Sequence, residues 1–225
     1  MDEMLRQVRA VPLGSDHEAA RVVLENCGWS VCGQGDWAIA LRSPDGRTAA
    51  RISPFDPSAP YTAALYRAGQ ASGWFPRLHL ERHLDGGAHL LLMEFLEPVD
   101  TAIGAAIHKR LQEPDPAIEP AAALLLRFHR EAAAALPWCG PIDDNPSNIM
   151  RAADGSLRIT DPFYADGPAL YRTLATEPIT VARAIPAASR RHILEIPLAG
   201  SGGWDDTERD RMRDGLARAD ADLIA

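Results

Sequence analysis

The sequence of 225 residues predicts an α+β fold in two lobes, in which a small antiparallel sheet precedes a mainly helical region. Between Gly28 and Pro98, apolar residues form short strand-like runs that are separated by turn signals. After Pro98, the apolar residues recur with the helical period. A composition of 46% hydrophobic and 24% charged residues is typical of a globular chain. We therefore expect an N-terminal helical extension over 1–27, a sheet lobe over 28–96 and a helical lobe over 97–225.

The first helical segment, residues 5–26, has an amphipathic pattern that is broken near Pro12-Leu13-Gly14. Ser15 is the candidate N-cap of the second half, because Glu18 follows it in the spacing of a capping box. We therefore expect two helical stretches that meet at this break.

The sheet lobe is expected to consist of two hairpins with a helix between them. Turn signals at Ser43–Gly46 and at Asp85-Gly86-Gly87 mark the two hairpins. The expected strands are 37–41, 48–52, 77–84 and 88–95, and the expected helix is 59–70.

The helical lobe is expected to begin with two helices and to contain one short hairpin. Residues 139–148 are rich in Gly, Pro, Asp and Asn and are predicted to be a loop, whereas residues 164–203 show no regular pattern and are predicted to be irregular. The expected helices are 101–112, 119–136 and 205–223, and the expected strands are 149–152 and 157–160.

Charge and hydropathy exclude several classes of partner. A net charge of −8 argues against nucleic acid, because phosphate binding needs a basic surface. The longest apolar run, 121–126, is far shorter than the roughly 18 residues of a membrane span. No signal peptide is visible at Met1–Met4, and three cysteines form no disulfide pattern. We therefore expect a cytoplasmic protein of a reducing compartment.

The strongest chemical signal is the segment Asp143–Asn148, which is followed by one short predicted hairpin and then by Asp161. Phosphoryl transfer needs a group that orients the acceptor hydroxyl and oxygen ligands for magnesium. Asp143 would accept the hydroxyl proton, and Asn148 and Asp161 would hold the metal, because the predicted hairpin returns the chain to its start. The segment could also be a simple turn capped by an Asn side chain.

Two further signals lie in the sheet lobe. Gly33 and Gly35 precede a strand and could let backbone N–H groups approach phosphates, and Arg51 lies on the strand after that one. Met93, Glu94 and Leu96 fall where the two lobes join, where a nucleotide base could pair with backbone groups. Taken alone, the glycines could form an ordinary turn, and residues 90–98 could be a buried strand that ends at a proline.

In this order, the residues resemble the protein-kinase-like superfamily, which includes aminoglycoside phosphotransferases and small bacterial and phage kinases. The resemblance covers about residues 28–165 and implies a two-lobed fold, ATP and Mg²⁺. Asp143–Asn148 looks like the catalytic loop, Asp161-Pro162-Phe163 like the Asp-Phe-Gly motif, Ala49–Ile52 like the Val-Ala-Ile-Lys strand, and Met93–Leu96 like the gatekeeper and hinge.

The sequence departs from the family pattern at several positions. Arg51 stands where the family has lysine, and the expected helix 59–70 contains no glutamate to pair with it. Pro141 stands where histidine or tyrosine usually precedes the catalytic aspartate, and Ala38 replaces the third glycine. The part of the chain after Phe163 is short, so the helical lobe is expected to be truncated, as in minimal kinase effectors of bacterial pathogens.

The function we expect is an ATP- and Mg²⁺-dependent phosphotransferase that acts on a hydroxyl group of a protein serine or threonine, in the cytoplasm or, after translocation, in a host cell. A small-molecule or peptide-biosynthetic kinase is the alternative enzyme. A pseudokinase, which binds nucleotide or acts as a scaffold, is the alternative from another class, and Arg51 favours it. His79 and His83 are expected not to share a zinc ion, because their separation along a strand spans roughly 13 Å.

Overall fold

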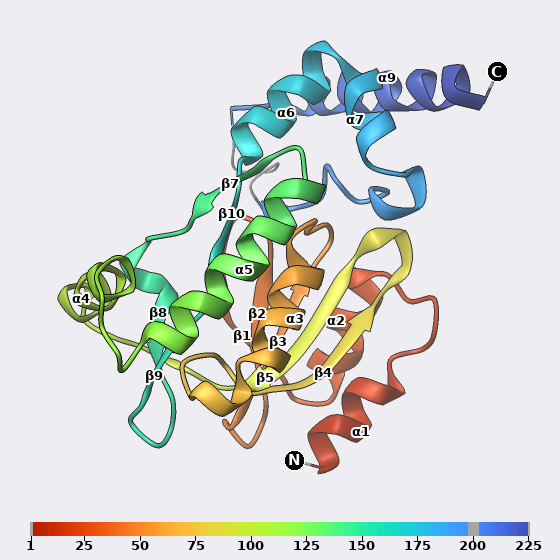
Figure 1. The fold of residues 1–225 in the computed structure, drawn as a ribbon. Coiled ribbons are helices and arrows are strands. Elements are labelled where there is room, and N and C mark those ends of the chain that lie inside the picture. Colours follow the sequence, from red (N-terminus) through yellow and green to blue (C-terminus); the bar gives the residue numbers. More distant parts are fainter. Residues whose placement is uncertain (1, 198–202, 225) are drawn as a thin grey trace.

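A five-stranded antiparallel sheet forms the first lobe, and helices predominate after residue 98 (Figure 1). The computed structural model describes residues 2–197 and 203–224. The strand order is β1-β2-β3-β5-β4, and every neighbouring pair is antiparallel. The predicted α+β class is confirmed, and the two hairpins lie where their turn signals place them. The strands are β1 (Ser30–Gln34), β2 (Ile39–Arg42), β3 (Thr48–Ser53), β4 (Leu78–His83) and β5 (His89–Glu94).

Side chains alternate between the two faces of the sheet, as the period of a β-strand requires. On β5, Leu90 and Leu92 join one apolar cluster, whereas Leu91 and Met93 join the other. On β3, Ala50 and Ile52 share the face of Leu90, so Arg51 lies on the opposite face, toward the helical lobe.

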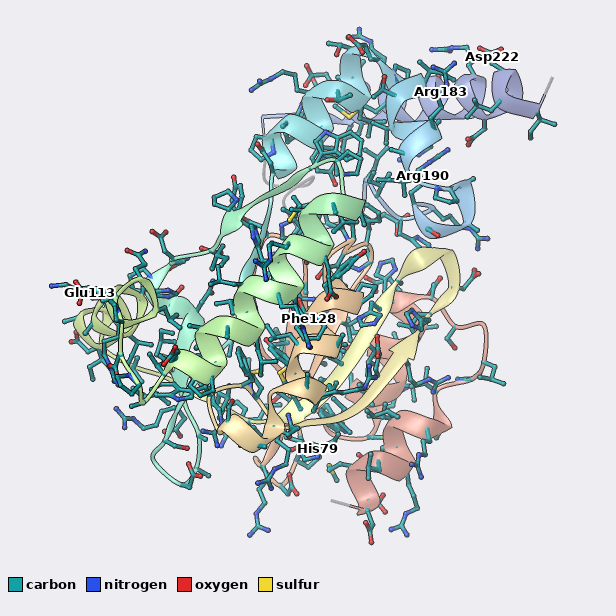
Figure 2. All side chains as sticks on the ribbon, in the orientation of Figure 1. His79, Glu113, Phe128, Arg183, Arg190 and Asp222 are labelled. Atoms are coloured by element: carbon teal, nitrogen blue, oxygen red, sulfur yellow. The ribbon has the colours of Figure 1, made fainter. Side chains whose placement is uncertain are left out.

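Helices cover both faces of the sheet. The N-terminal helices α1 (Asp2–Ala10) and α2 (His17–Asn26) pack on one face, and α3 (Ala59–Ala68) and α5 (Glu119–Ala135) pack on the other. Phe128 of α5 is buried in the cluster that contains Leu91 and Met93, near the centre of the molecule (Figure 2). The sheet therefore sits between two helical layers, which bury both of its faces.

The N-cap of α2 differs by one position from the prediction. Asp16, not Ser15, has the extended backbone of an N-cap, and its Oδ1 accepts a 2.8 Å hydrogen bond from the Ala19 amide. The Ser15 carbonyl instead accepts the Asp85 amide at 2.9 Å. A contact with a turn that is distant in sequence therefore holds Ser15 outside the helix.

The prediction of a loop over 139–148 is wrong in its first part. Strand β7 (Cys139–Ile142) pairs with β10 (Phe163–Ala165), and a 3₁₀ turn (Pro146–Asn148) follows it. A Cys-Gly-Pro-Ile segment has no strand pattern of its own, so only its partner, which is distant along the chain, makes it a strand. The other elements of this region are β6 (Glu97–Pro98), α4 (Thr101–Gln112), β8 (Ile149–Arg151) and β9 (Leu157–Ile159).

The prediction of irregular structure over 164–203 is wrong for most of the described part. Helices α6 (Gly167–Thr176) and α7 (Pro178–Ala184) occupy it, and residues 198–202 lie outside the described ranges. Both helices carry proline in the first turn, where a helix tolerates it, although proline elsewhere interrupts a helical pattern. They pack against α9 (Asp206–Ile224) at the top of Figure 1. Within the described ranges, no helix has the length and apolar character needed to cross a bilayer.

Candidate functional site

A cavity of about 390 Å³ lies where the sheet lobe meets the β8–β9 hairpin. This volume is in the range of pockets that hold small organic ligands. The cavity brings together all the residues that the sequence indicated for nucleotide and metal, which come from both lobes. These residues are Gly33, Gly35, Arg51, Met93, Glu94, Leu96, Asn148 and Asp161.

The glycine-rich turn borders the cavity and leaves it open. Gly33 belongs to β1, and the Gly35 amide donates to the Ala38 carbonyl at 2.9 Å, which closes the turn. A Cβ atom at Gly35 would meet nothing within 4 Å, and one at Gly33 would touch only the Ala40 side chain, at 3.9 Å. Packing inside the protein therefore requires neither glycine, and the space beside them is free for a ligand.

Arg51 points into the site and not to solvent. Its side chain is only 16% exposed, and its Nη1 lies 2.8 Å from the Asp56 carboxylate. Its Nη2 lies 3.3 Å from the Asp161 carboxylate, which belongs to the other lobe. Burial acts to lower the pKa of Arg51, but Asp161 and Asp56 outweigh it and raise that pKa above its ordinary value. Arg51 is therefore a permanently charged link between the two lobes.

Asp56 is a site residue that the sequence analysis missed. Its side chain is 3% exposed, and its Oδ1 accepts hydrogen bonds from the Ser58 amide at 2.9 Å and the Ser58 hydroxyl at 2.7 Å. The helix after Arg51 contains no glutamate, as the sequence shows, but Asp56, in the loop before α3, supplies the orienting carboxylate instead. Asp56 is the only acidic residue between Arg51 and Gln70, so the sequence did contain a signal that could have identified it as the partner of Arg51.

Asp161 occupies a backbone conformation that is rare for a residue other than glycine, with φ at 43°. Two contacts hold it there: its amide donates to the Tyr66 hydroxyl at 3.0 Å, and its carbonyl accepts the Asn148 side-chain amide at 3.1 Å. The β8–β9 hairpin thus returns the chain to its start, and Asn148 and Asp161 meet. The carboxylate itself is 48% exposed, so a ligand in the cavity can reach it.

The electrostatics around Asp161 favour a cation. Burial raises the pKa of its carboxyl above the ordinary value, Arg51 acts in the opposite direction, and Asp56 and Asp143 raise that pKa further. Two of these carboxylates, Asp56 and Asp161, pair with the guanidinium of Arg51, and Asp143 adds a third negative charge nearby. Carboxylate and amide oxygens are the ligands that Mg²⁺ takes in proteins. The donor set of Asp161 and Asn148 thus fits a magnesium ion.

Asp143 lies beside the cavity and does not line it. Its amide donates to the Pro162 carbonyl at 3.0 Å, and its Oδ1 accepts the Asn145 amide at 2.9 Å. The first contact fixes the segment of Asp143 against the segment of Asp161. Its carboxylate raises the pKa of both Asp161 and Tyr164, so it lies near both side chains.

Two histidines position these loops. His108 of α4 contacts the Asn145 carbonyl at 3.0 Å, and His129 of α5 contacts the Gly140 carbonyl at 2.8 Å. The His129 ring also stacks on Phe163, with a centroid distance of 6.4 Å. Helices α4 and α5 therefore hold the segments on both sides of Asp143.

At the junction of the lobes, several backbone amides are already hydrogen-bonded and are not available to a nucleotide base. The Glu94 amide already donates to the Arg77 carbonyl at 3.0 Å, and the Phe95 amide donates to the Arg47 carbonyl at 2.9 Å. The Glu94 carboxylate accepts Arg158 Nε at 2.8 Å, which ties β5 to β9. Met93, Glu94 and Leu96 all line the cavity. Leu96 comes directly after Phe95, which is the last of these residues whose amide is already bonded.

Comparisons with known proteins give structural likeness alone. No family model matches the chain, and no curated protein matches it in sequence. A double mutant of the kinase domain of Mycobacterium tuberculosis PknI is 15% identical with a TM-score of 0.29, covering 84% of this chain and 96% of that one. The apo GRMZM2G135359 pseudokinase is 11% identical with a TM-score of 0.31, covering 87% and 85%. Likeness at this level assigns no role to any residue, so the interpretation of the site depends on its own geometry.

Proposed function

We propose that this chain is an ATP- and Mg²⁺-dependent phosphotransferase whose acceptor is a hydroxyl group, with serine or threonine of a protein as the acceptor class. The observation that carries this proposal is that Arg51, Asn148 and Asp161 line one nucleotide-sized cavity. The cavity thus brings together a permanent cation of the sheet lobe and oxygen ligands of the other lobe. Phosphates of a nucleotide need both kinds of group, a cationic contact and a metal ligand.

The phosphates would lie between the glycine-rich turn and Arg51. Backbone N–H groups near Gly33 and Gly35 can approach phosphate oxygens because no side chain occupies that space. Arg51 can bind phosphate through two N–H groups, since its guanidinium is planar. Asn148 and Asp161 would hold Mg²⁺, which, when bound, neutralises charge on the β- and γ-phosphates. The base would lie against Met93 and use the backbone of Leu96.

Asp143 would orient the acceptor. The acceptor oxygen forms a bond to the γ-phosphorus as the bond to the leaving ADP oxygen breaks, and Asp143 accepts the hydroxyl proton. Its position next to Asp161 but outside the nucleotide cavity supports this division of roles. The binding of nucleotide would then depend little on Asp143.

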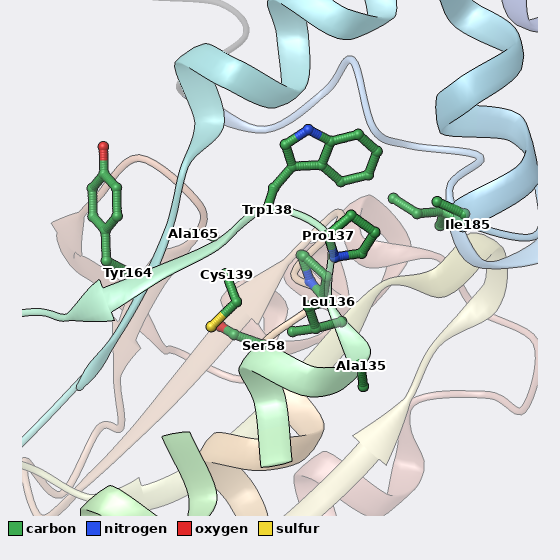
Figure 3. A pocket seen from close by; sticks show the side chains of 11 residues that line it. Ser58, Ala135, Leu136, Pro137, Trp138, Cys139, Tyr164, Ala165 and Ile185 are labelled. Atoms are coloured by element: carbon green, nitrogen blue, oxygen red, sulfur yellow. The ribbon is translucent and has the colours of Figure 1, made fainter. Parts of the chain in front are cut away.

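The acceptor side of the site favours a macromolecule over a small molecule. Figure 3 shows a cavity that is lined by Trp138, Cys139 and Tyr164 among others, and Tyr164 is also a residue whose pKa burial and the Asp143 carboxylate raise. Its volume is about 40 Å³, which is much smaller than the roughly 300 Å³ at which ligand pockets begin. A protein chain that lies across the surface near the exposed Tyr164 needs no such pocket. The small-molecule kinase is therefore the second candidate enzyme.

The pseudokinase is a further candidate because of one contact. Arg51 already pairs with the carboxylate that would hold the metal, and this pair would have to loosen when Mg²⁺ and nucleotide bind. A nucleotide-binding scaffold would retain the pair. We place the protein in the cytoplasm, or in a host cell after translocation, since its three cysteines are free and suit a reducing compartment. The acidic net charge supports neither nucleic acid nor an anionic membrane surface as a partner.

The test is incubation with γ-labelled ATP and Mg²⁺, alone and with a cell lysate. Label on serine or threonine of a protein supports the proposal, label on a small molecule supports the second enzyme, and nucleotide binding without transfer supports the pseudokinase. Asp143→Asn should reduce turnover by orders of magnitude with a modest change in the Kd of ATP. Arg51→Ala should lose most transfer, whereas Arg51→Lys should keep part of it. Full activity of Arg51→Ala would contradict the role given to this residue.

A further inference from the structure

A second group of metal-ligating side chains lies outside the nucleotide cavity. His17 at the start of α2, His192 and Glu195 bring ligand atoms within 4.8 Å of one another. The Glu195 carboxylate is 2.8 Å from His192 Nδ1 and 3.4 Å from His17 Nε2. Ligand atoms of a tetrahedral ion with bonds of about 2.0–2.1 Å are roughly 3.3 Å apart. The two distances from Glu195 are close to this value, so the three side chains lie within reach of one shared ion.

The two histidines are buried and incompletely partnered in the described structure. Both are more than nine-tenths buried, and His17 Nδ1 and His192 Nε2 have no hydrogen-bond partner there. Their rings meet edge to face with centroids 4.8 Å apart. The ring nitrogens that would bind an ion are the opposite ones, His17 Nε2 and His192 Nδ1, and both of these lie near the Glu195 carboxylate.

The backbone fixes these side chains before any ion binds. The turn Asp85–Gly87 receives both segments: the Asp85 amide donates to the Ser15 carbonyl at 2.9 Å, and the Arg191 amide donates to the Gly86 carbonyl at 3.1 Å. A Cβ atom at Gly86 would overlap the His192 ring, so the glycine allows that ring to lie against the turn. The Asp85–Gly87 turn thus holds in place the two segments that carry His17 and His192.

The surroundings suit a divalent ion with one open position. Glu18 adds a second carboxylate, 3.7 Å from His17 Nε2, and Asp16 is adjacent in sequence. A cavity of about 210 Å³, lined by His17, Glu195 and Arg21 among others, borders the group and gives room for water. Arg21 pairs with Glu25 at 2.9 Å and so leaves the Glu195 carboxylate available. Two histidines, one carboxylate and a water form a common coordination set for zinc.

We propose that His17, His192 and Glu195 bind one Zn²⁺-type divalent transition-metal ion, which joins the N-terminal helix α2 to the segment after Ser189. The site is independent of the phosphotransfer proposed above. The bound ion would connect the N-terminal extension, which covers one face of the sheet, to the helical lobe. The ion would therefore stabilise the relative position of the chain's first and last segments.

The other histidine group of the sheet is a natural control. Glu81, His83 and His89 also lie within 4.8 Å of one another. However, the Glu81 carboxylate already pairs with Arg67, and the His83 side chain is 73% exposed. An ion there would compete with a guanidinium, so we expect weaker binding. His83→Ala is therefore the matched variant that should leave zinc binding unchanged.

The test is zinc binding by the chelator-stripped full chain at about neutral pH, measured by equilibrium dialysis in the absence of nucleotide. Wild type and His83→Ala should bind one tight equivalent, and Zn²⁺ should raise their Tm by mass action. His17→Gln and Glu195→Gln should each weaken binding by at least tenfold and remove that rise in Tm. Co²⁺ in place of Zn²⁺ should give the visible spectrum of a four-coordinate ion that both variants lose.

Three results would overturn the site: wild type that binds no zinc at micromolar concentrations, variants that bind zinc as wild type does, or a loss of binding in His83→Ala. Glu195 has a 48% exposed side chain, so Glu195→Gln should fold even if His17→Gln does not. Binding at the free cysteines would leave the His17 and Glu195 variants unchanged and would therefore count against the proposal.

Discussion

The substitution Asp56→Asn tests whether a buried carboxylate positions Arg51. It preserves the volume of the side chain and the oxygen that accepts from Ser58. It converts the other oxygen, which lies 2.8 Å from Arg51 Nη1, into an NH₂ group that repels the guanidinium. Breaking a buried ion pair costs about 3–5 kcal/mol, and the remaining contact with Asp161 at 3.3 Å reduces this loss to about 2–3 kcal/mol. For a chain of this size, Tm should fall by about 4–12 °C.

A control for this substitution exists in the same chain. Asp154 accepts hydrogen bonds from the amide and hydroxyl of Ser156, in the same local arrangement as Asp56 and Ser58. Its side chain is 68% exposed, and its carboxylate lies 3.6 Å from Arg158 Nη2. Asp154→Asn should therefore change Tm little.

Thermal and urea unfolding, followed by circular dichroism, measure both variants. Adding Arg51→Met to Asp56→Asn should cost less than the sum of the two single losses, because the two residues form one ion pair. Equal losses of stability in Asp56→Asn and Asp154→Asn would refute the reasoning, since the local turn and not the ion pair would then account for the effect.

Three further predictions follow from the structure. Asp161→Ala should abolish the Mg²⁺-dependent part of the rise in Tm that nucleotide causes, measured with and without chelator, and an unchanged rise would contradict its role as a ligand. Gly104→Ala should lower Tm by several degrees although alanine favours helices, because its Cβ would overlap the Pro146 carbonyl; a higher Tm would show that this packing is absent. The free energy of unfolding should fall as pH decreases from about 7 to 5, because burial lowers the pKa of folded His17 and His89 and the unfolded chain takes up protons first. The slope can reach about 1.4 kcal/mol per pH unit for each proton, and urea titrations that give a flat profile would contradict it.

The sequence alone determined the elements that have strong local signals. The hairpin turns at Ser43–Gly46 and Asp85–Gly87 contain the residues that such turns require, and the helices 101–112 and 119–135 have a clear period. These signals act between residues a few positions apart, so no distant contact is needed to make them effective. For the same reason, the short hairpin between Asn148 and Asp161 was enough to predict that these two residues meet.

Elements without such signals were decided by distant partners. Strand β7 exists because β10 pairs with it, and α6 and α7 are stabilised by packing on α9. The N-cap moved from Ser15 to Asp16 because the Asp85 amide holds the Ser15 carbonyl. In each case the free energy comes from hydrogen bonds or apolar burial between segments that the local pattern does not connect.

The candidate site likewise contains residues that the sequence indicated and residues that only the structure revealed. The order of Gly33, Gly35, Arg51, Asn148 and Asp161 along the chain indicated which residues should meet, because each has a residue type suited to phosphate or metal. The partners that orient them are ordinary in sequence: an aspartate in a loop, a tyrosine on α3 and two histidines on α4 and α5. Their importance depends on burial and on hydrogen-bond distances of about 3 Å, because a charge or hydrogen bond matters most where water is excluded. Which side chains share such an environment is a property of the assembled core, and only the tertiary structure decides it.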